Sequence, residues 1–182
     1  MVTDLFLSLL ELVNRSTQLR HLRLVSCGKL STERLNVVVE KLPLLEEFHL
    51  YYTYIDKEAI ETIGCCCPLL KSFTYNQKWI IKNYKYRDDT LNDNDEALAI
   101  AKNIPGLRHL QLEGNRMTNI GLQALLDGCP HLDSLVLEQC LNINLNGDVG
   151  KRCSKIKDMH FHLDLAIWSH QMIYYLYEDF QW

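Results

Sequence analysis

Apolar residues recur along this chain in two alternating patterns, one of period two and one of helical spacing. The period-two pattern runs apolar-x-x-apolar-x-apolar and ends in a polar residue or a cysteine, as in "LRHLQLEGN" at 107–115. Such alternation predicts a strand with one buried face. The stretches that follow, such as the one containing Leu122, Leu125 and Leu126, place their apolar residues on one side of a helix. The chain therefore predicts strands that alternate with helices.

The period-two pattern occurs six times at a nearly constant interval. Its copies begin near residues 19, 45, 70, 107, 132 and 156. Neighbouring copies lie about 25 residues apart, and the step from 70 to 107 is longer by about 12 residues. We interpret residues 79–93 as an insertion that leaves the repeat as a loop, either to bind a partner or as a solvated excursion.

Signals for the start and the end of a helix repeat with the strands. Candidate N-caps, whose side chains accept hydrogen bonds from the first free helical amides, are Ser31, Asp56, Asn94 and Thr118. A proline, which cannot continue a helix, follows each of them at Pro43, Pro68, Pro105 and Pro130. One unit is therefore strand, turn, helix, turn, and no unit can bury its apolar face alone.

This period predicts a leucine-rich-repeat solenoid of the α/β class. We expect an arc with parallel strands on its concave face and helices on its convex face. Residues 19–164 form the repeats, and residues 1–18 fit the helix half of a truncated first repeat. Residues 165–182 are a divergent aromatic tail, which we expect either to cap the last repeat or to bind a partner as a helix.

Composition and charge narrow the functions that this fold can serve. The 182 residues fit one domain with an ordinary share of hydrophobic and charged residues. The formal net charge of −4 argues against nucleic-acid binding. No apolar run reaches the roughly 20 residues that span a bilayer, and the N-terminus lacks the features of a signal peptide. Seven cysteines without a disulfide-type spacing favour a reducing compartment, the cytoplasm or the nucleus.

Three adjacent cysteines, Cys65 to Cys67, precede Pro68 and are the most conspicuous candidates for chemistry. The position before each proline, or its equivalent, holds a small or medium apolar residue: Leu42, Cys67, Ile104, Cys129 and Cys153. The position that ends each strand pattern holds Cys27, Thr53, Lys78, Asn115 and Cys140. In leucine-rich repeats this position uses a short polar group to hydrogen-bond the turn backbone. Side chains of adjacent helical residues point about 100° apart, so the three thiols cannot share one zinc ion. We predict no metal and no cofactor, and we expect one of Cys65 and Cys66 to be buried and the other partly exposed.

The residues between the apolar positions of each strand should project from the concave face. Five of the seven histidines fall at these positions. They show no nucleophile with an oriented base, so we predict that the chain is not an enzyme. A surface that binds a protein partner is favoured over a merely solvated sheet face. The candidate contacts are His21, Arg23, Glu47, His49, Tyr51, His109, Gln111, Glu113, Glu138 and His160.

The wording of the repeats adds a resemblance to a known family. "STQLRHLRLVSCGKLSTERL", "CPLLKSF" and above all residues 92–153 resemble the plant F-box/leucine-rich-repeat proteins, whose repeats are of the cysteine-containing, ribonuclease-inhibitor-like class. The resemblance covers about residues 4–157. It implies that the repeats recognise the substrate of a Skp–cullin–F-box ubiquitin ligase, and so act in ubiquitin-dependent proteasomal degradation.

The same resemblance leaves a second function open. This sequence contains no recognisable F-box, the helical domain with which the family docks on a Skp-type adaptor. We therefore expect contact with that adaptor only if an F-box lies upstream of these residues. The alternative is a stand-alone repeat protein that acts as an interaction or scaffold protein without a ligase role.

Overall fold

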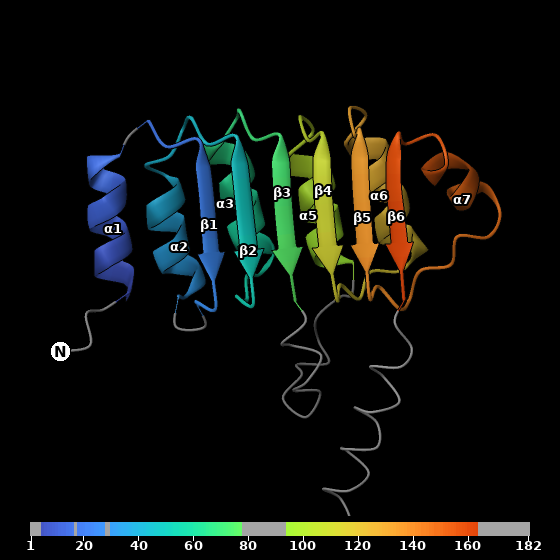
Figure 1. Ribbon diagram of the computed structural model, residues 1–182, viewed down its shortest axis with the longest axis horizontal. Helices are drawn as coiled ribbons and strands as arrows, with labels where there is room; N and C mark the ends of the chain where they lie inside the picture. The colour runs from blue at the N-terminus through green and yellow to red at the C-terminus, as the bar shows by residue number, and fades with distance from the viewer. Residues whose placement is uncertain (1–4, 17, 28–29, 78–93, 164–182) are drawn as a thin grey trace, which may run out of the picture.

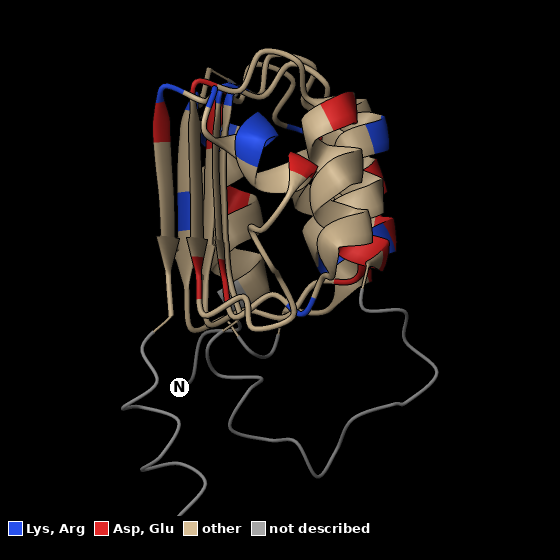
Figure 2. Ribbon diagram, turned by 90° about the vertical axis from the view of Figure 1, so that its right-hand side faces the viewer, with Lys and Arg blue, Asp and Glu red and all other residues tan. Residues whose placement is uncertain are grey.

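The computed structural model describes residues 5–16, 18–27, 30–77 and 94–163, and it forms two layers (Figures 1 and 2). The strands are β1 (His21–Val25), β2 (Glu47–Tyr51), β3 (Ser72–Asn76), β4 (His109–Glu113), β5 (Ser134–Glu138) and β6 (Asp158–His162). The helices are α1 (Leu5–Arg15), α2 (Thr32–Val39), α3 (Lys57–Cys66), α5 (Asp95–Asn103), α6 (Asn119–Gly128) and α7 (Asp148–Cys153). All six strands are parallel and lie in sequence order, with the helices on one side of the sheet. The predicted α/β repeat fold is confirmed, and the sheet face turned away from the helices is called the concave face below.

The strands pair without any offset from one repeat to the next. His21 lies opposite Glu47, which lies opposite Ser72, and the same row continues through β6. The carbonyl oxygen of Arg20 accepts hydrogen bonds from the amides of both Glu46 and Glu47, at 2.8 and 2.9 Å. The same pair of bonds recurs at Glu46, Lys71 and Arg108. The residues between 77 and 94 therefore do not shift the register of the sheet.

The residue after a strand usually bends into the left-handed region. Ser26, Tyr52 and Gln139 have φ angles of 54° to 56°, and Gly114 has a φ of 70°. Each of these residues donates its amide to the last residue of the next strand, for example from Ser26 to the carbonyl of Tyr51 at 2.8 Å. A side chain in this region costs roughly 1–2 kcal/mol, so the final ladder bond is made against local strain.

The core lies between the sheet and the helices. Every strand from β1 to β5 buries its second and fourth residues, such as Phe48 and Leu50 of β2. Tyr75 of β3 is completely buried, and its hydroxyl donates to the carbonyl of Ile55 (2.9 Å) and accepts from the Ile55 amide (3.1 Å). Burial raises the pKa of this hydroxyl and keeps it neutral. A large aromatic residue thus ties one repeat to the turn of the repeat before it.

All four predicted residues occupy the N-cap position of their helices, but only three of them make the expected side-chain hydrogen bond. The side chains of Ser31, Asp56 and Thr118 each accept a hydrogen bond from an amide at the start of their own helix. Asn94 makes no such bond, because its backbone is already helical, with φ −102° and ψ −6°. Its Oδ1 instead accepts from the amides of Thr118 (3.0 Å) and Gly121 (2.9 Å). Asn94 therefore caps the helix of the next repeat.

The two structural positions assigned to cysteines are confirmed where the structure describes them. The five residues at or equivalent to the position before each proline are all buried. At the end of the strand pattern, the Thr53 hydroxyl accepts from the Cys27 amide, and Asn115 Oδ1 accepts from the Met117 amide. The thiols of Cys27 and Cys140 contact backbone carbonyls in the same turn. Lys78, the 79–93 insertion and the 165–182 tail lie outside the described residues.

Gly64 permits the close packing of α3 against α5. A Cβ added at Gly64 would lie 2.4 Å from the carbonyl oxygen and 2.6 Å from the Cβ of Asn103. Both contacts are shorter than carbon and oxygen atoms tolerate, and one of them is to rigid backbone. The distance between the two helices therefore depends on this glycine.

We predict that Gly64→Ala lowers the free energy of unfolding by about 1–3 kcal/mol, because the helices must separate to admit one methyl group. Gly106→Ala is the matched control, since its Cβ would lie 3.7 Å from the carbonyl of Leu70 in ordinary contact. Chemical denaturation of both variants measures the difference. Equal midpoints for Gly64→Ala and the wild type would show that the helices are not closely packed there.

Candidate functional site: the concave face

The concave face gathers the ten candidate residues on five of the six strands. Because side chains alternate along a strand, the first, third and fifth residues of each strand project away from the helices. Exposure along this face is uneven. His21, Arg23, His109 and His160 are exposed, Glu47, His49, Tyr51, Gln111 and Glu138 are half-buried, and Glu113 is buried.

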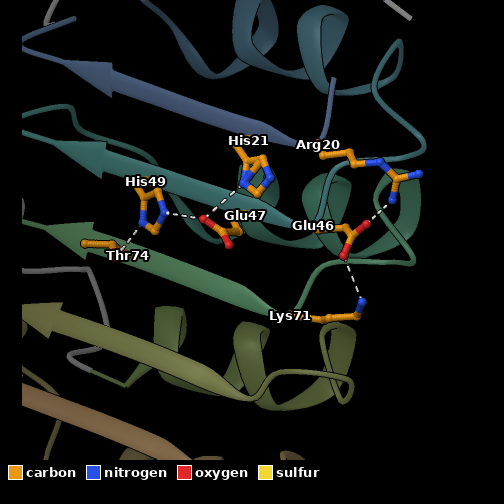
Figure 3. A network of polar contacts seen from close by, with 7 residues as sticks. All are labelled: Arg20, His21, Glu46, Glu47, His49, Lys71 and Thr74. Carbon is orange, nitrogen blue, oxygen red and sulfur yellow. Dashed lines mark hydrogen bonds and ion pairs between the residues drawn. The ribbon is translucent and has the colours of Figure 1, made fainter. Parts of the chain in front are cut away.

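Glu47 lies between two histidines on β1 and β2 (Figure 3). Its Oε2 atom is 3.1 Å from His21 Nδ1 and 3.6 Å from His49 Nε2. On its other side, His49 Nδ1 lies 2.8 Å from the Thr74 hydroxyl of β3. The tautomer of His49 with its proton on Nε2 satisfies both neighbours, because it points a donor at Glu47 and accepts from Thr74. Three strands therefore hold one polar chain of side chains.

An arginine stacks on a tyrosine beside this chain. The guanidinium carbon of Arg23 lies 4.5 Å from the centre of the Tyr51 ring, within cation–π range. Val25, the neighbour of Tyr51 across the strand pair, is exposed. Arginine and tyrosine are the residue types that most often dominate the energy of protein interfaces. This corner of β1 and β2 has the composition of a protein-binding surface.

The middle of the concave face is closed where β3 and β4 end. Thr74 and Asn76 of β3 are buried, and Asn76 Nδ2 donates to the carboxylate of Glu113. Behind them, Asn115 Nδ2 lies 3.2 Å from Gln77 Oε1 and 3.3 Å from Glu96 Oε2. Glu113 is thus occupied by an internal contact and is the least accessible of the ten candidate residues.

A second polar group lies on β5 and β6. Asp158 accepts a hydrogen bond from the Ser134 hydroxyl at 2.9 Å, and its other oxygen lies 2.8 Å from His160 Nε2. The Ser134 hydroxyl, together with His160, lowers the pKa of the Asp158 carboxyl. Ser134 and Asp158 were not candidates, although their strand positions are the same as those of His21 and Glu47.

A row of charges along the rim of the sheet was missed by sequence reasoning. The residue directly before each strand is charged, and Glu46 lies between Arg20 and Lys71, with its Oε2 2.8 Å from Lys71 Nζ (Figure 3). Arg108 and Asp133 form the next pair at 2.7 Å. The sequence does contain a signal for these ion pairs, because residues of opposite charge occupy the same position of adjacent repeats, 25 or 26 residues apart. These pairs join adjacent repeats at their exposed edge.

The seven cysteines show no reactive arrangement. All are free thiols, and Cys27, Cys67, Cys129, Cys140 and Cys153 are buried. Burial raises the pKa of Cys67 and Cys140 to about 12 and that of Cys129 to about 11. The expectation that one of Cys65 and Cys66 is buried is wrong: Cys66 is half-buried and Cys65 exposed. Both lie in the last turn of α3, where only Cys67, the residue that ends the helix, turns fully inward.

Within the described ranges, no group of three or more histidine, cysteine, aspartate or glutamate side chains is arranged to hold a metal ion. Nor does any helix in these ranges have the length and apolar character needed to cross a membrane.

Comparison with known proteins shows to which proteins the chain is related. It is 47% identical over 149 residues to Putative F-box/LRR-repeat protein 22 of Arabidopsis thaliana, covering 81% of this chain and 45% of that protein. Putative F-box/LRR-repeat protein 23 of the same plant is 43% identical over 83% of this chain and 33% of its own length. The chain is a homologue of the plant F-box/LRR-repeat proteins. It spans half or less of the length of these relatives.

Other comparisons agree with this relationship. F-box protein SKIP19 of Arabidopsis thaliana is 41% identical over 78% of this chain and 43% of its own length. The names of these three relatives describe no enzymatic activity. No model of a protein family matches the chain. The solved C-terminal domain of Caenorhabditis elegans tropomodulin shares the fold alone, with a TM-score of 0.54, 12% identity, and coverage of 85% of this chain and 92% of that one.

We predict that Cys65 is the first thiol to react with a thiol-labelling reagent in the native state at pH 8. Cys66 should react more slowly because it is half-buried, and the five buried thiols should react only on unfolding. Peptide mapping after timed labelling identifies the modified residues. If Cys65→Ser still shows the fast phase, the exposure assigned to α3 is incorrect.

We predict that the stabilisation from Glu46 depends on pH. Lys71 and Arg20 lower the pKa of the Glu46 carboxyl below its usual value of 4.5. The ion pairs therefore stabilise the fold at neutral pH, and this contribution disappears as the pH falls through the lowered pKa. Glu46→Gln should have a lower melting temperature than the wild type at pH 7, and the gap should narrow as the pH is lowered from 7 to 3. Glu61→Gln on the exposed side of α3 is the control, and a Glu46→Gln gap of equal size at both pH values would contradict the pairing.

Proposed function

We propose that the chain is a protein-binding module that recognises the substrate of a Skp–cullin–F-box ubiquitin ligase. It would thereby act in ubiquitin-dependent proteasomal degradation. The observation that carries the proposal is the 47% identity, over most of this chain, to a relative whose name joins an F-box to these repeats. In such a protein an F-box would hold the Skp-type adaptor, and the repeats would hold the substrate.

The concave face supports a protein as the partner. Its side chains come from strands that the sheet holds in fixed register, so they are arranged before binding and lose little freedom on contact. The stacked pair of Arg23 and Tyr51 supplies a central anchor, and the Glu47–His49–Thr74 chain supplies polar groups around it. We expect the substrate to contact this corner of β1 and β2 first.

We place this function in the cytoplasm or the nucleus, where ubiquitin ligases of this type work. Seven free cysteines, five of them buried as apolar residues, support a reducing compartment. The alternative remains an interaction or scaffold protein without a ligase role. The two are separated by the fate of the bound protein, not by its binding.

We predict that the triple variant Arg23→Ala, His49→Ala, Tyr51→Ala loses at least about tenfold of the wild-type affinity for the substrate, because it removes the anchor without touching the core. The matched control is Glu58→Ala, Glu61→Ala, Lys102→Ala on exposed parts of α3 and α5. Each protein is used to capture partners from plant cells treated with a proteasome inhibitor. Circular dichroism verifies that all three proteins are folded.

A partner retained by the wild type and the control but lost by the concave variant, with a lifetime that lengthens when cullin ligases are inhibited, fits the proposal. A partner captured equally by the concave variant would place the binding surface elsewhere. A partner whose lifetime is independent of cullin activity and of this protein would favour the scaffold function.

A further inference from the structure

The turn between β5 and α7 contains the only asparagine of the chain that is followed by glycine. Asparagine occupies every second position there, as Asn142, Asn144 and Asn146, and Gly147 follows the last of them. The side-chain carbonyl of an asparagine can react with the backbone nitrogen of the next residue, because the two groups close a five-membered ring. Glycine leaves that nitrogen accessible, since it has no Cβ. The other two asparagines precede isoleucine and leucine, whose branched side chains shield the nitrogen.

Hydrogen bonds hold the other asparagines of this region, whereas the side chain of Asn146 makes none within the described part of the chain. The Asn119 side chain binds the backbone of Asn144, donating to its carbonyl at 2.8 Å and accepting from its amide at 2.9 Å. Asn142 Nδ2 donates to the carbonyl of Arg116 at 2.7 Å. Asn144 Oδ1 accepts from the Asn146 amide at 2.9 Å, but Asn146 itself is exposed. Its side chain can therefore rotate toward the backbone nitrogen that follows it.

The backbone nitrogen of Gly147 is accessible as well. Gly147 is exposed, its φ is 75°, and a Cβ built on it would meet no atom within 4 Å. Its carbonyl accepts a hydrogen bond from the Lys151 amide at 3.3 Å, whereas its own amide donates none among the described residues. Asp127 and Gly128 form a pair that could close the same ring, but Gly128 is the last residue of α6. Helical hydrogen bonding holds the amide of Gly128, so this second pair is closed to the reaction.

We propose that Asn146 and Gly147 form a covalent modification site, at which the folded protein deamidates itself to aspartate and isoaspartate. The Gly147 nitrogen gives its proton to water or hydroxide and attacks Cγ of Asn146. A carbon–nitrogen bond forms, a succinimide ring closes, and the side-chain nitrogen takes up a proton and leaves as ammonia. Water then opens the ring by breaking one of its two carbon–nitrogen bonds. Breaking the new bond gives aspartate, and breaking the original peptide bond gives isoaspartate, in which the main chain runs through the former side chain.

Isoaspartate lengthens the main chain by one carbon atom between two points that are packed against α7. A Cβ built on Gly150 of α7 would lie 1.8 Å from the carbonyl oxygen of Leu145, so this carbonyl already contacts the helix. On the other side of Asn146, the Gly147 carbonyl accepts from the Lys151 amide. The longer main chain must displace one of these contacts, so the first turn of α7 opens. Neither product returns to asparagine, and the opened form therefore accumulates with the age of each molecule.

The test incubates the folded 182-residue chain at mildly alkaline pH and digests samples under acidic conditions, where the reaction is slow. Mass spectrometry then measures, at each asparagine, the mass gain from replacing NH2 by OH. We expect Asn146 to convert at least about tenfold faster than Asn142 or Asn144. An isoaspartyl methyltransferase verifies the isoaspartate product. Asn146→Gln is the matched control and should show no conversion at residue 146, because its longer side chain would have to close a six-membered ring.

A synthetic peptide of residues 140–150 gives the rate of the same reaction without the fold. Conversion of Asn146 in the peptide but not in the folded chain would overturn the proposal, because the fold would then close the site. Conversion of Asn142 or Asn144 as fast as that of Asn146 would overturn it as well. In aged wild type, but not in aged Asn146→Gln, the Lys151 amide should exchange with solvent faster than in fresh protein. Unchanged exchange in fully converted protein would contradict the opening of α7.

Discussion

The structure depends on one constraint, the pairing of six parallel strands without an offset. The carbonyl of the residue before a strand accepts hydrogen bonds from two amides of the next repeat. The amide of the residue after that strand donates to the last residue of the strand in the same next repeat. A slip of one residue would turn every apolar side chain of a strand out of the core. Zero offset therefore places the buried residues in continuous rows, such as Leu22, Phe48 and Phe73, and the projecting residues in parallel rows on the concave face.

To keep this register, some residues adopt a strained backbone and others contribute a side chain to a neighbouring repeat. Ser26, Tyr52 and Gln139 adopt left-handed backbone and in return complete the ladder at the end of each strand. Asn94 gives its side chain to the helix of the following repeat, and the Tyr75 hydroxyl serves the turn of the preceding one. Each repeat is thus completed by its neighbours, which is why the array folds as one sheet.

The sequence predicts those features that follow from the repeat period, namely which positions are buried and which project from the sheet. One position of the repeat holds Leu42, Cys67 and Ile104, so the burial of these residues followed from the alignment of the repeats alone. The projection of His21 and His49 from the sheet followed in the same way. Features that depend on contacts between repeats could not be read in this way. The sequence predicts that Asn94 caps its own helix, whereas in the structure its side chain accepts a hydrogen bond from the Thr118 amide. The strand pattern predicts that Glu113 is exposed, whereas its carboxylate is buried and accepts a hydrogen bond from Asn76. The prediction that one of Cys65 and Cys66 is buried was wrong for a similar reason, because the exposure of both thiols depends on the geometry of the last turn of one helix.

Amide hydrogen exchange, resolved by residue, tests the register most directly. We predict that the amides of Phe48, Leu110 and Leu135 exchange slowly and as one cooperative unit, because all strands open together. The amides of His21, Arg23 and Val25 should exchange much faster than that of Leu24, which faces β2. Exchange of β1 amides without this alternation, or separate opening of β2 and β5 with unrelated free energies, would contradict a single sheet in fixed register.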